Sequence, residues 1–375
     1  MWQEEKKKVI KQALNSFLFP LFEDEVMKDL AAAAIKFGVA EAASSLQAMA
    51  FEGPYRPNNL LGENRFIVPT GELPFVGVSV GLDSREATFL AAVSARGELK
   101  SSLAIPAGKQ VTDLDMHDKV VGFLMSARPS AVVVGTAGGI LSRLLNRKLS
   151  DIVNEATEKW NNRLLRGEDE DDEEYGARKR DFENRYGMFE NYDDQDGELW
   201  KCNVDLIDDN VAQLFGRSVR GTKEFPDAPV NLKCAISIAR HAQDPLAELC
   251  YAWSVASDTG NFGVEMLSMN VHPLQRHVPR AALLRSYERA LCRAVAEVGV
   301  DVNAACTLDH KHGALQFVPG FGPRKAANLK QNVARMGGSV PSRKYLLAKR
   351  LLGPLVYNNI VAFLRIRVCE QLSVR

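Results

Sequence analysis

A change of hydrophobic period near residue 74 constrains the fold of this chain more than any other feature. Between residues 6 and 49, apolar side chains recur at helical spacing among good helix formers. The runs PFVGVSVG (74–81) and ATFLAAVS (87–94) instead have strand character, and 99–105 is a third such run. The sequence therefore predicts an N-terminal helical segment followed by a three-stranded antiparallel meander.

Helices and further strands alternate after the meander. The run AVVVG (131–135) is continuously apolar and rich in valine, which is typical of a strand buried on both faces. Helical character is predicted at 115–126, 140–165, 210–215 and 231–253, and a short strand at 204–207. Three meander strands followed by alternating helices and strands predict an α/β domain with a mixed sheet, in the order of the ribonuclease-H-like fold.

Charge is distributed unevenly along the chain, although its 375 residues carry no net charge. Residues 167–198 hold 14 acidic and 4 basic side chains, and we expect this stretch to be an exposed insertion because it offers little apolar surface to a core. From residue 268 to the end, 17 Lys and Arg stand against 5 Asp and Glu. This basic third is either a footprint for a polyanion or a solvated helical surface.

Several classes of protein are disfavoured by composition. No stretch approaches the roughly 18 apolar residues of a membrane span, and the start MWQEEKKKVI lacks a secretory apolar region. We therefore expect a soluble, intracellular protein with no membrane partner. The six cysteines form no C-x-x-C pair, which favours reduced core thiols over a disulfide framework or a zinc site.

The strongest local motif is VPGFGPRKAANL, residues 318–329. Gly320 and Gly322 can adopt positive φ at a turn between two helices, and Pro323 suits the first position of the second helix. The unpaired amides at that helix start, beside Arg324 and Lys325, can hold a phosphate without reading sequence. The alternative is a tight turn that serves only packing between helices.

A second hairpin is predicted at 342–366, with Gly353 and Pro354 as its turn. Basic residues accompany both hairpins. The predicted nucleic-acid-binding residues are Gly320, Gly322, Arg324, Lys325, Lys330, Arg343, Lys344, Lys349 and Arg350.

A ribonuclease-H-like sheet raises the question of nuclease activity, which requires several carboxylates around a pair of metal ions. The candidates are Asp83, Asp208, Asp209 and Asp244. Ser79 occupies the place on the first strand where an acidic residue usually stands, and Asp244 before a proline is typical of a helix cap. We therefore predict no catalytic residue.

Other motifs predict neither a metal site nor a cofactor. The glycines of VVVGTAGGI (132–140) do not match a nucleotide-binding pattern and favour a packing turn. The pairs His272 with His277 and His310 with His312 lack partners spaced to complete a tetrahedral metal site, which favours structural or exposed histidines.

Four segments together resemble a known family in the same order along the chain: AISIARHAQDPLAEL (235–249), NVHPLQRHV (270–278), EVGVDVN (297–303) and the hairpin at 318–329. They resemble the core shared by bacterial Tex proteins and the eukaryotic suppressor-of-Ty transcription elongation factor and histone chaperone, and ALNSFLFP and GPYRP resemble the eukaryotic branch. The resemblance implies a helical segment at 1–52, a YqgF-type ribonuclease-H-like domain at 74–265 with an insertion at 167–198, and a helix-hairpin-helix domain at 268–368.

The resemblance also implies a non-enzymatic nuclear protein that travels with the RNA polymerase II elongation complex and handles histones or nucleosomes. No segment resembles the family's acidic N-terminal arm, S1-type barrel or tandem SH2 modules, so we expect an excised core that binds DNA or RNA weakly and without sequence preference. Two alternatives remain open. One is a divergent metal-dependent nuclease or resolvase using Asp83, Asp208 and Asp244, and the other is a protein-interaction platform whose hairpins only pack.

Overall fold

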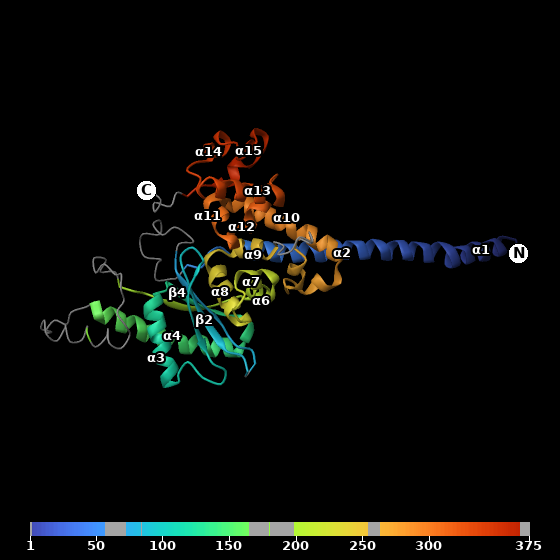
Figure 1. The fold of residues 1–375 in the computed structure, drawn as a ribbon. Coiled ribbons are helices and arrows are strands. Elements are labelled where there is room, and N and C mark those ends of the chain that lie inside the picture. Colours follow the sequence, from blue (N-terminus) through green and yellow to red (C-terminus); the bar gives the residue numbers. More distant parts are fainter. Residues whose placement is uncertain are drawn as a thin grey trace.

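The computed structural model describes residues 2–56, 73–83, 85–164, 180, 199–253 and 263–367. A five-stranded mixed sheet lies between helices, and a helical region follows it in the chain (Figure 1). This architecture confirms the predicted α/β domain with additional helical parts at both ends of the sequence.

The sheet has the strand order β3-β2-β1-β4-β5. Its strands are β1 (Phe75–Ser79), β2 (Thr88–Val93), β3 (Leu99–Ile105), β4 (Ala131–Gly135) and β5 (Asn203–Ile207). The first three form the predicted antiparallel meander, whereas β4 pairs in parallel with both β1 and β5. Every residue of β4 is buried, as its continuous apolar run predicts.

Helices cover both faces of the sheet (Figure 1). The helices α3 (Leu114–Ala127) and α4 (Ile140–Leu164) share a core with one face, and α6 (Asn210–Arg217) and α8 (Val230–Gln243) lie on the other. Gly77 of β1 permits the close approach of α8, because a Cβ there would lie 2.0 Å from the Ala235 carbonyl oxygen. A 3-10 turn, Thr136–Gly138, joins β4 to α4.

The predicted helix at 231–253 is two helices, α8 and α9 (Pro245–Trp253). Pro245 has no N–H to continue α8, and Asp244 leaves the helical conformation before it. The Asp244 side chain accepts a hydrogen bond from the Ala247 amide at 3.0 Å, which confirms its role as a helix cap.

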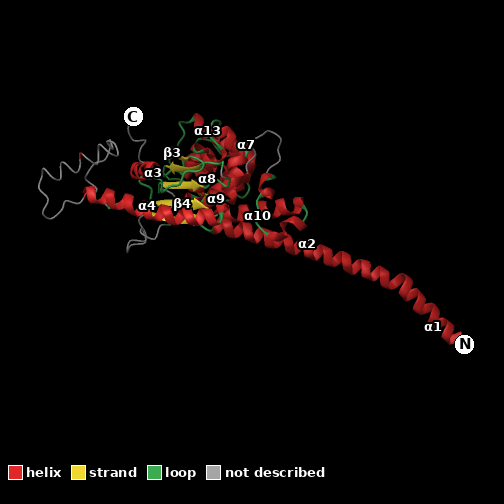
Figure 2. Cartoon of the chain, turned by 90° about the horizontal axis from the view of Figure 1, so that it is seen from below, coloured by secondary structure: helices red, strands yellow, loops and turns green. Residues whose placement is uncertain are grey.

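The N-terminal segment is one long helical rod made of α1 (Trp2–Ala13), a π-helical turn (Leu14–Leu18) and α2 (Phe19–Phe51). Pro20 cannot donate to the carbonyl four residues earlier, which accounts for the wider turn that precedes it. Side chains of α2 are buried only from Gly38 onward, where the helix packs against α10. The preceding half projects from the molecule with its apolar side chains exposed (Figure 2).

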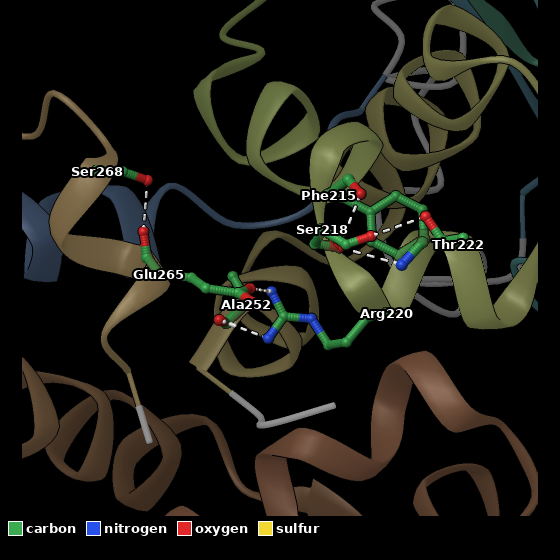
Figure 3. A network of polar contacts seen from close by, with 8 residues as sticks. Phe215, Ser218, Arg220, Thr222, Ala252, Glu265 and Ser268 are labelled. Carbon is green, nitrogen blue, oxygen red and sulfur yellow. Dashed lines mark hydrogen bonds and ion pairs between the residues drawn. The ribbon is translucent and has the colours of Figure 1, made fainter. Parts of the chain in front are cut away.

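A buried arginine ties the sheet-covering helices to the helical region. Arg220 of α7 (Val219–Glu224) donates to the Ala252 carbonyl at 2.8 Å and to Glu265 at 2.7 Å (Figure 3). Burial lowers the pKa of its guanidinium, while Glu265 opposes that shift. Because Glu265 belongs to the 3-10 turn Glu265–Ser268, this contact joins segments on either side of the undescribed stretch 254–262.

Short helical elements make up the rest of the chain and share a core with α2 and α9. They are η5 (Pro273–His277), α10 (Arg280–Val298), α11 (Val302–Thr307), α12 (Asp309–His312), η6 (Gly313–Phe317), α13 (Gly322–Arg335), α14 (Arg343–Ala348), α15 (Pro354–Ile360) and η7 (Val361–Phe363). Two two-residue strands that the sequence did not predict, β6 (Val300–Asp301) and β7 (Leu364–Arg365), pair in parallel and join the end of α10 to the end of this region.

Cysteines in the described residues are free thiols. Cys202, Cys234, Cys250 and Cys306 are buried and Cys292 is half-buried, as expected for core thiols, whereas Cys369 lies outside the described residues. The expected insertion at 167–198 also lies outside them, apart from residue 180. No helix in the described ranges has both the length and the apolar character needed to cross a membrane.

Candidate nucleic-acid interface

The predicted hairpin joins η6 to α13 through a tight turn. The Phe321 amide donates to the Val318 carbonyl at 2.9 Å, with Pro319 and Gly320 between them. Gly320 has φ +83°, so proline followed by a left-handed glycine has the residue pattern of a type II turn. Gly322 has φ +72°, which confirms the predicted positive φ at both glycines.

Buried apolar side chains on the core side of the hairpin hold this turn in place. Phe317, Val318 and Phe321 are each 3% exposed or less and belong to the helical core. Leu329 and Val333 bury the inner face of α13 in the same core. The glycines and the start of α13 are therefore fixed on the outside of a packed hairpin.

The start of α13 is open to a ligand. Pro323 takes an early helical position, as predicted, and no side chain caps this end of the helix within the described chain. A Cβ at Gly322 would have no atom within 4 Å, so the space above the turn is free of protein. Helices leave their first amides without partners in the helix, and the dipole makes this end attractive to anions.

The cations of this hairpin differ in their availability. Arg324 and Lys325 are exposed, and the Lys325 ammonium donates to the Gly320 carbonyl at 2.9 Å, which braces the turn. An ammonium has two further N–H donors for a ligand. Lys330 instead pairs with Asp309, and that hydrogen bond is the main cause of the lowered pKa of Asp309. Lys330 is thus the least available of the predicted phosphate contacts.

The second predicted hairpin is present as α14 and α15, with Gly353 and Pro354 at the turn. Figure 1 shows α13, α14 and α15 gathered at one end of the molecule. The Cβ of Asn359 in α15 lies 4.0 Å from the position that a Cβ at Gly320 would take, so the two hairpins adjoin. Four of the predicted contacts are exposed on and after α14: Arg343, Lys344, Lys349 and Arg350.

Arg350 ends α14 in an unusual conformation. Its φ is +53°, and its amide donates to Leu347 while the Leu351 amide donates to Leu346, both at 3.0 Å. These are the two bonds of a Schellman motif, in which the left-handed position is normally glycine. An arginine there keeps a positive charge beside Lys349, whose ammonium lies 5.8 Å from the Tyr345 ring centre.

One positioning residue was missed by the sequence interpretation. The buried Asn303 side chain donates to the Val340 carbonyl at 3.0 Å and to the Arg367 carbonyl at 2.9 Å, and accepts from the Val340 amide at 2.8 Å. It therefore fixes the segment that leads into α14 and the segment after β7. The only signal for it was its place in the EVGVDVN segment.

The edge of the sheet where a nuclease would hold metal ions is filled by contacts within the protein. Asp209 is buried, and it accepts hydrogen bonds from Gln213 at 3.2 Å and Thr136 at 3.4 Å. Burial raises the pKa of Asp209. A Cβ on Gly135, at the end of β4, would lie 2.7 Å from the Asp209 carboxylate.

The remaining nuclease candidates form no metal-binding cluster with Asp209 among the described residues. Ser79 is buried, and its hydroxyl has no hydrogen-bond partner among the described residues. Asp208 accepts hydrogen bonds from Asn210, and Asp244 caps α9. Asp83 lines a separate groove of about 400 Å³ beyond β1. In the described part of the chain, no three His, Cys, Asp or Glu side chains are placed to hold a metal ion.

Of the histidines in the two pairs, His272 and His312 make local contacts, His310 is buried and His277 is exposed. His272 accepts from the Leu274 amide at 3.2 Å and caps η5, and His312 lies 3.2 Å from the Ala305 carbonyl. His310 is buried, and burial together with Arg240 lowers its pKa to about 2. Its ring is therefore neutral at ordinary pH.

Comparisons with known families agree with this arrangement. Residues 264–367 match a helix-hairpin-helix motif model, and residues 186–252 match a model described as the Holliday-junction resolvase-like domain of SPT6. The chain thus combines a resolvase-like domain of this type with a helix-hairpin-helix region.

Named relatives point to one family. Over 166 residues, or 44% of the chain, it is 34% identical to the Suppressor of Ty 6 homolog of Caenorhabditis briggsae, of which it spans 10%. It is 34% identical over 46% of its length to the transcription elongation factor spt-6 of Neurospora crassa, of which it spans 12%. A transcription elongation factor SPT6 homolog of Arabidopsis thaliana is 27% identical over 98% of the chain, which spans 20% of it. These findings confirm the predicted resemblance to the suppressor-of-Ty family.

Proposed function

We propose that this chain is the core of a nuclear transcription elongation factor and histone chaperone that acts as a non-catalytic scaffold. Its relatives are named as transcription elongation factors, and the chain spans only 10 to 20% of the three described above. The RNA polymerase II elongation complex and histones or nucleosomes are its proposed protein partners. The domain limits proposed for it are 1–52, 74–265 and 268–368.

The scaffold's own contact with nucleic acid is proposed to be the pair of hairpins. The observation that carries this proposal is the open start of α13, where two left-handed glycines expose a helix N-terminus beside Arg324 and Lys325. Such a site holds phosphates and reads no bases, so DNA or RNA binds without sequence preference. With few phosphates engaged, we expect dissociation constants of about 10⁻⁴ to 10⁻⁶ M at physiological salt.

A divergent nuclease or resolvase is the second candidate, and the structure favours it less. The buried Asp209 is already satisfied by Gln213 and Thr136, and Ser79 supplies no carboxylate. A third candidate, an interaction platform whose hairpins only pack, differs from the scaffold by its lack of salt-dependent binding.

The experiment is a salt titration of binding to a labelled 20-base-pair duplex. Arg324→Glu with Lys325→Glu should weaken binding to two unrelated sequences equally and lower the magnitude of the log–log salt slope by about 0.9 per lost phosphate contact. The matched control is Lys7→Glu with Lys11→Glu, two exposed residues of α1 that undergo the same change of charge. Equal slopes and affinities for wild type and the hairpin variant would favour the interaction platform instead.

A further inference from the structure

The outer face of α10 carries a row of arginines that the hairpins do not use. Arg285, Arg289 and Arg293 are exposed and stand four residues apart, so they line one face of this 19-residue helix. At 1.5 Å per residue, neighbours in the row are about 6 Å apart along the axis. The buried residues of α10, among them Tyr287 and Leu291, lie on its opposite face.

A fourth exposed arginine lies beside the end of the helix. A Cβ at Gly299, which follows α10, would lie 3.1 Å from the Arg365 guanidinium nitrogen Nε. Pairing of β6 with β7 holds Arg365 at this place. We call Arg285, Arg289 and Arg293 the α10 arginine row, and Arg365 lies beside the glycine that follows the helix.

These arginines are largely free for a ligand. Within the described residues, Arg285, Arg289 and Arg365 have no acidic partner, and Arg293 pairs with Glu297 at 3.3 Å on the exposed surface. Exposed pairs of this kind contribute little and exchange readily. Glu288 is the other acidic residue of α10, so the face remains basic.

We propose that the α10 arginine row is a second nucleic-acid contact, which binds the phosphodiester backbone of a strand lying along the helix. The planar guanidinium fork suits phosphate oxygens, and a straight row at regular spacing suits a repeating anion. Between Arg285 and Arg293 the exposed side chain other than Arg289 is that of Glu288, and Ser286 is half-buried, so the row offers no exposed apolar side chain to anchor a peptide. This site lies outside the two hairpins, so it would bind nucleic acid even if the hairpins only packed against the protein.

The test replaces Arg285, Arg289 and Arg293 together by Gln, which keeps helix propensity and removes three charges. Binding is measured by fluorescence anisotropy against salt, with a labelled 20-nucleotide oligo(dT) and a 20-base-pair duplex as separate probes. We expect affinity for oligo(dT) to fall about tenfold or more at 50 mM salt, with a salt slope smaller in magnitude by about 2, at about 0.7 per phosphate. A similar loss on the duplex alone would assign the row to double-stranded DNA.

Controls separate this site from the hairpins and from nonspecific charge effects. Lys7, Lys11 and Lys36 are exposed on the N-terminal helices, and their triple Gln variant removes the same charge elsewhere. The hairpin variant Arg324→Glu with Lys325→Glu is measured alongside, and independent sites should give additive losses. Unchanged slopes for both probes, or a loss of affinity no larger than that of the lysine control, would overturn the proposal.

Discussion

Arg350 offers a test of whether charge at the second hairpin is maintained against a conformational cost. Its φ of +53° places a non-glycine residue where the Schellman motif favours glycine. The left-handed conformation costs a non-glycine residue about 1–2 kcal/mol. Glycine avoids that cost but loses about 0.5–1 kcal/mol more conformational entropy on folding. Arg350→Gly should therefore be about 0.5–1 kcal/mol more stable than Arg350→Ala, which keeps the strain.

Both variants remove the same charge, so both should weaken duplex binding equally and lower the magnitude of the salt slope by about 0.9 if Arg350 contacts one phosphate. The free energy of unfolding is measured by urea denaturation, and binding by salt titration. Arg128→Gly is a matched comparison, because Arg128 also has positive φ, +40°, but its guanidinium lies 4.7 Å from the Trp160 ring centre. In Arg128→Gly, loss of the contact with Trp160 should cancel the stability gained by relieving the positive φ. Equal stability of Arg350→Gly and Arg350→Ala would refute the reasoning.

Three further predictions concern the scaffold. Burial raises the pKa of Glu248 to about 7 in the folded state, whereas the unfolded chain releases this proton near pH 4.5. The free energy of unfolding is therefore highest below about pH 4.5, and it falls as the pH rises to 7. Urea unfolding from pH 5 to 7.5 should show wild type losing stability relative to Glu248→Gln, and parallel curves would contradict this. Asn303→Ala should lower the free energy of unfolding by about 3 kcal/mol, because it leaves the buried Val340 amide and carbonyl without hydrogen-bond partners. It should also weaken duplex binding by displacing α14, and an unchanged urea midpoint would count against this positioning role. Deleting residues 1–35 should leave the thermal midpoint unchanged and reduce self-association in light scattering, since the described residues 2–35 bury no side chain and expose residues such as Phe17 and Phe22; a lowered midpoint would show that they stabilise the fold.

Local sequence pattern was sufficient to predict the sheet. The meander runs alternate or are short and apolar, and the continuous valines of AVVVG predict a strand buried on both faces, which is β4 between β1 and β5. The hairpin was predictable for the same reason, since proline and glycine restrict the turn at 318–322 to few conformations. The break between α8 and α9 was missed, although Pro245 marks it, because the apolar pattern continues through it.

Contacts between distant segments were not predictable from local pattern. The Asn303 hydrogen bonds span 37 and 64 residues, and the Lys330 pair with Asp309 spans 21. Nothing in the neighbourhood of Lys330 distinguishes it from Lys325, yet one is engaged by a carboxylate and the other braces the turn. Likewise, positive φ at Arg350 depends on how α14 ends, because the residue type alone disfavours it.

The last prediction concerns the sheet edge that nucleases of this fold use. If the edge only lacked ligands, Ser79→Asp would restore a carboxylate beside Asp209 and metal ions would stabilise the variant. The structure predicts a different outcome, because Ser79 is 1% exposed and the Asp209 carboxylate packs so closely that a Cβ added at Gly135 would lie 2.7 Å from it. A carboxylate at position 79 would be buried without a cation, at a cost of several kcal/mol. Ser79→Asp should therefore lower the thermal midpoint, and neither 5 mM Mg²⁺ nor Mn²⁺ should restore it, whereas Ser79→Ala should be tolerated because the hydroxyl has no described partner. Recovery of the midpoint by Mn²⁺ in Ser79→Asp, but not in Ser79→Ala, would show instead that this edge can still hold a metal ion, and the nuclease candidate would have to be reconsidered.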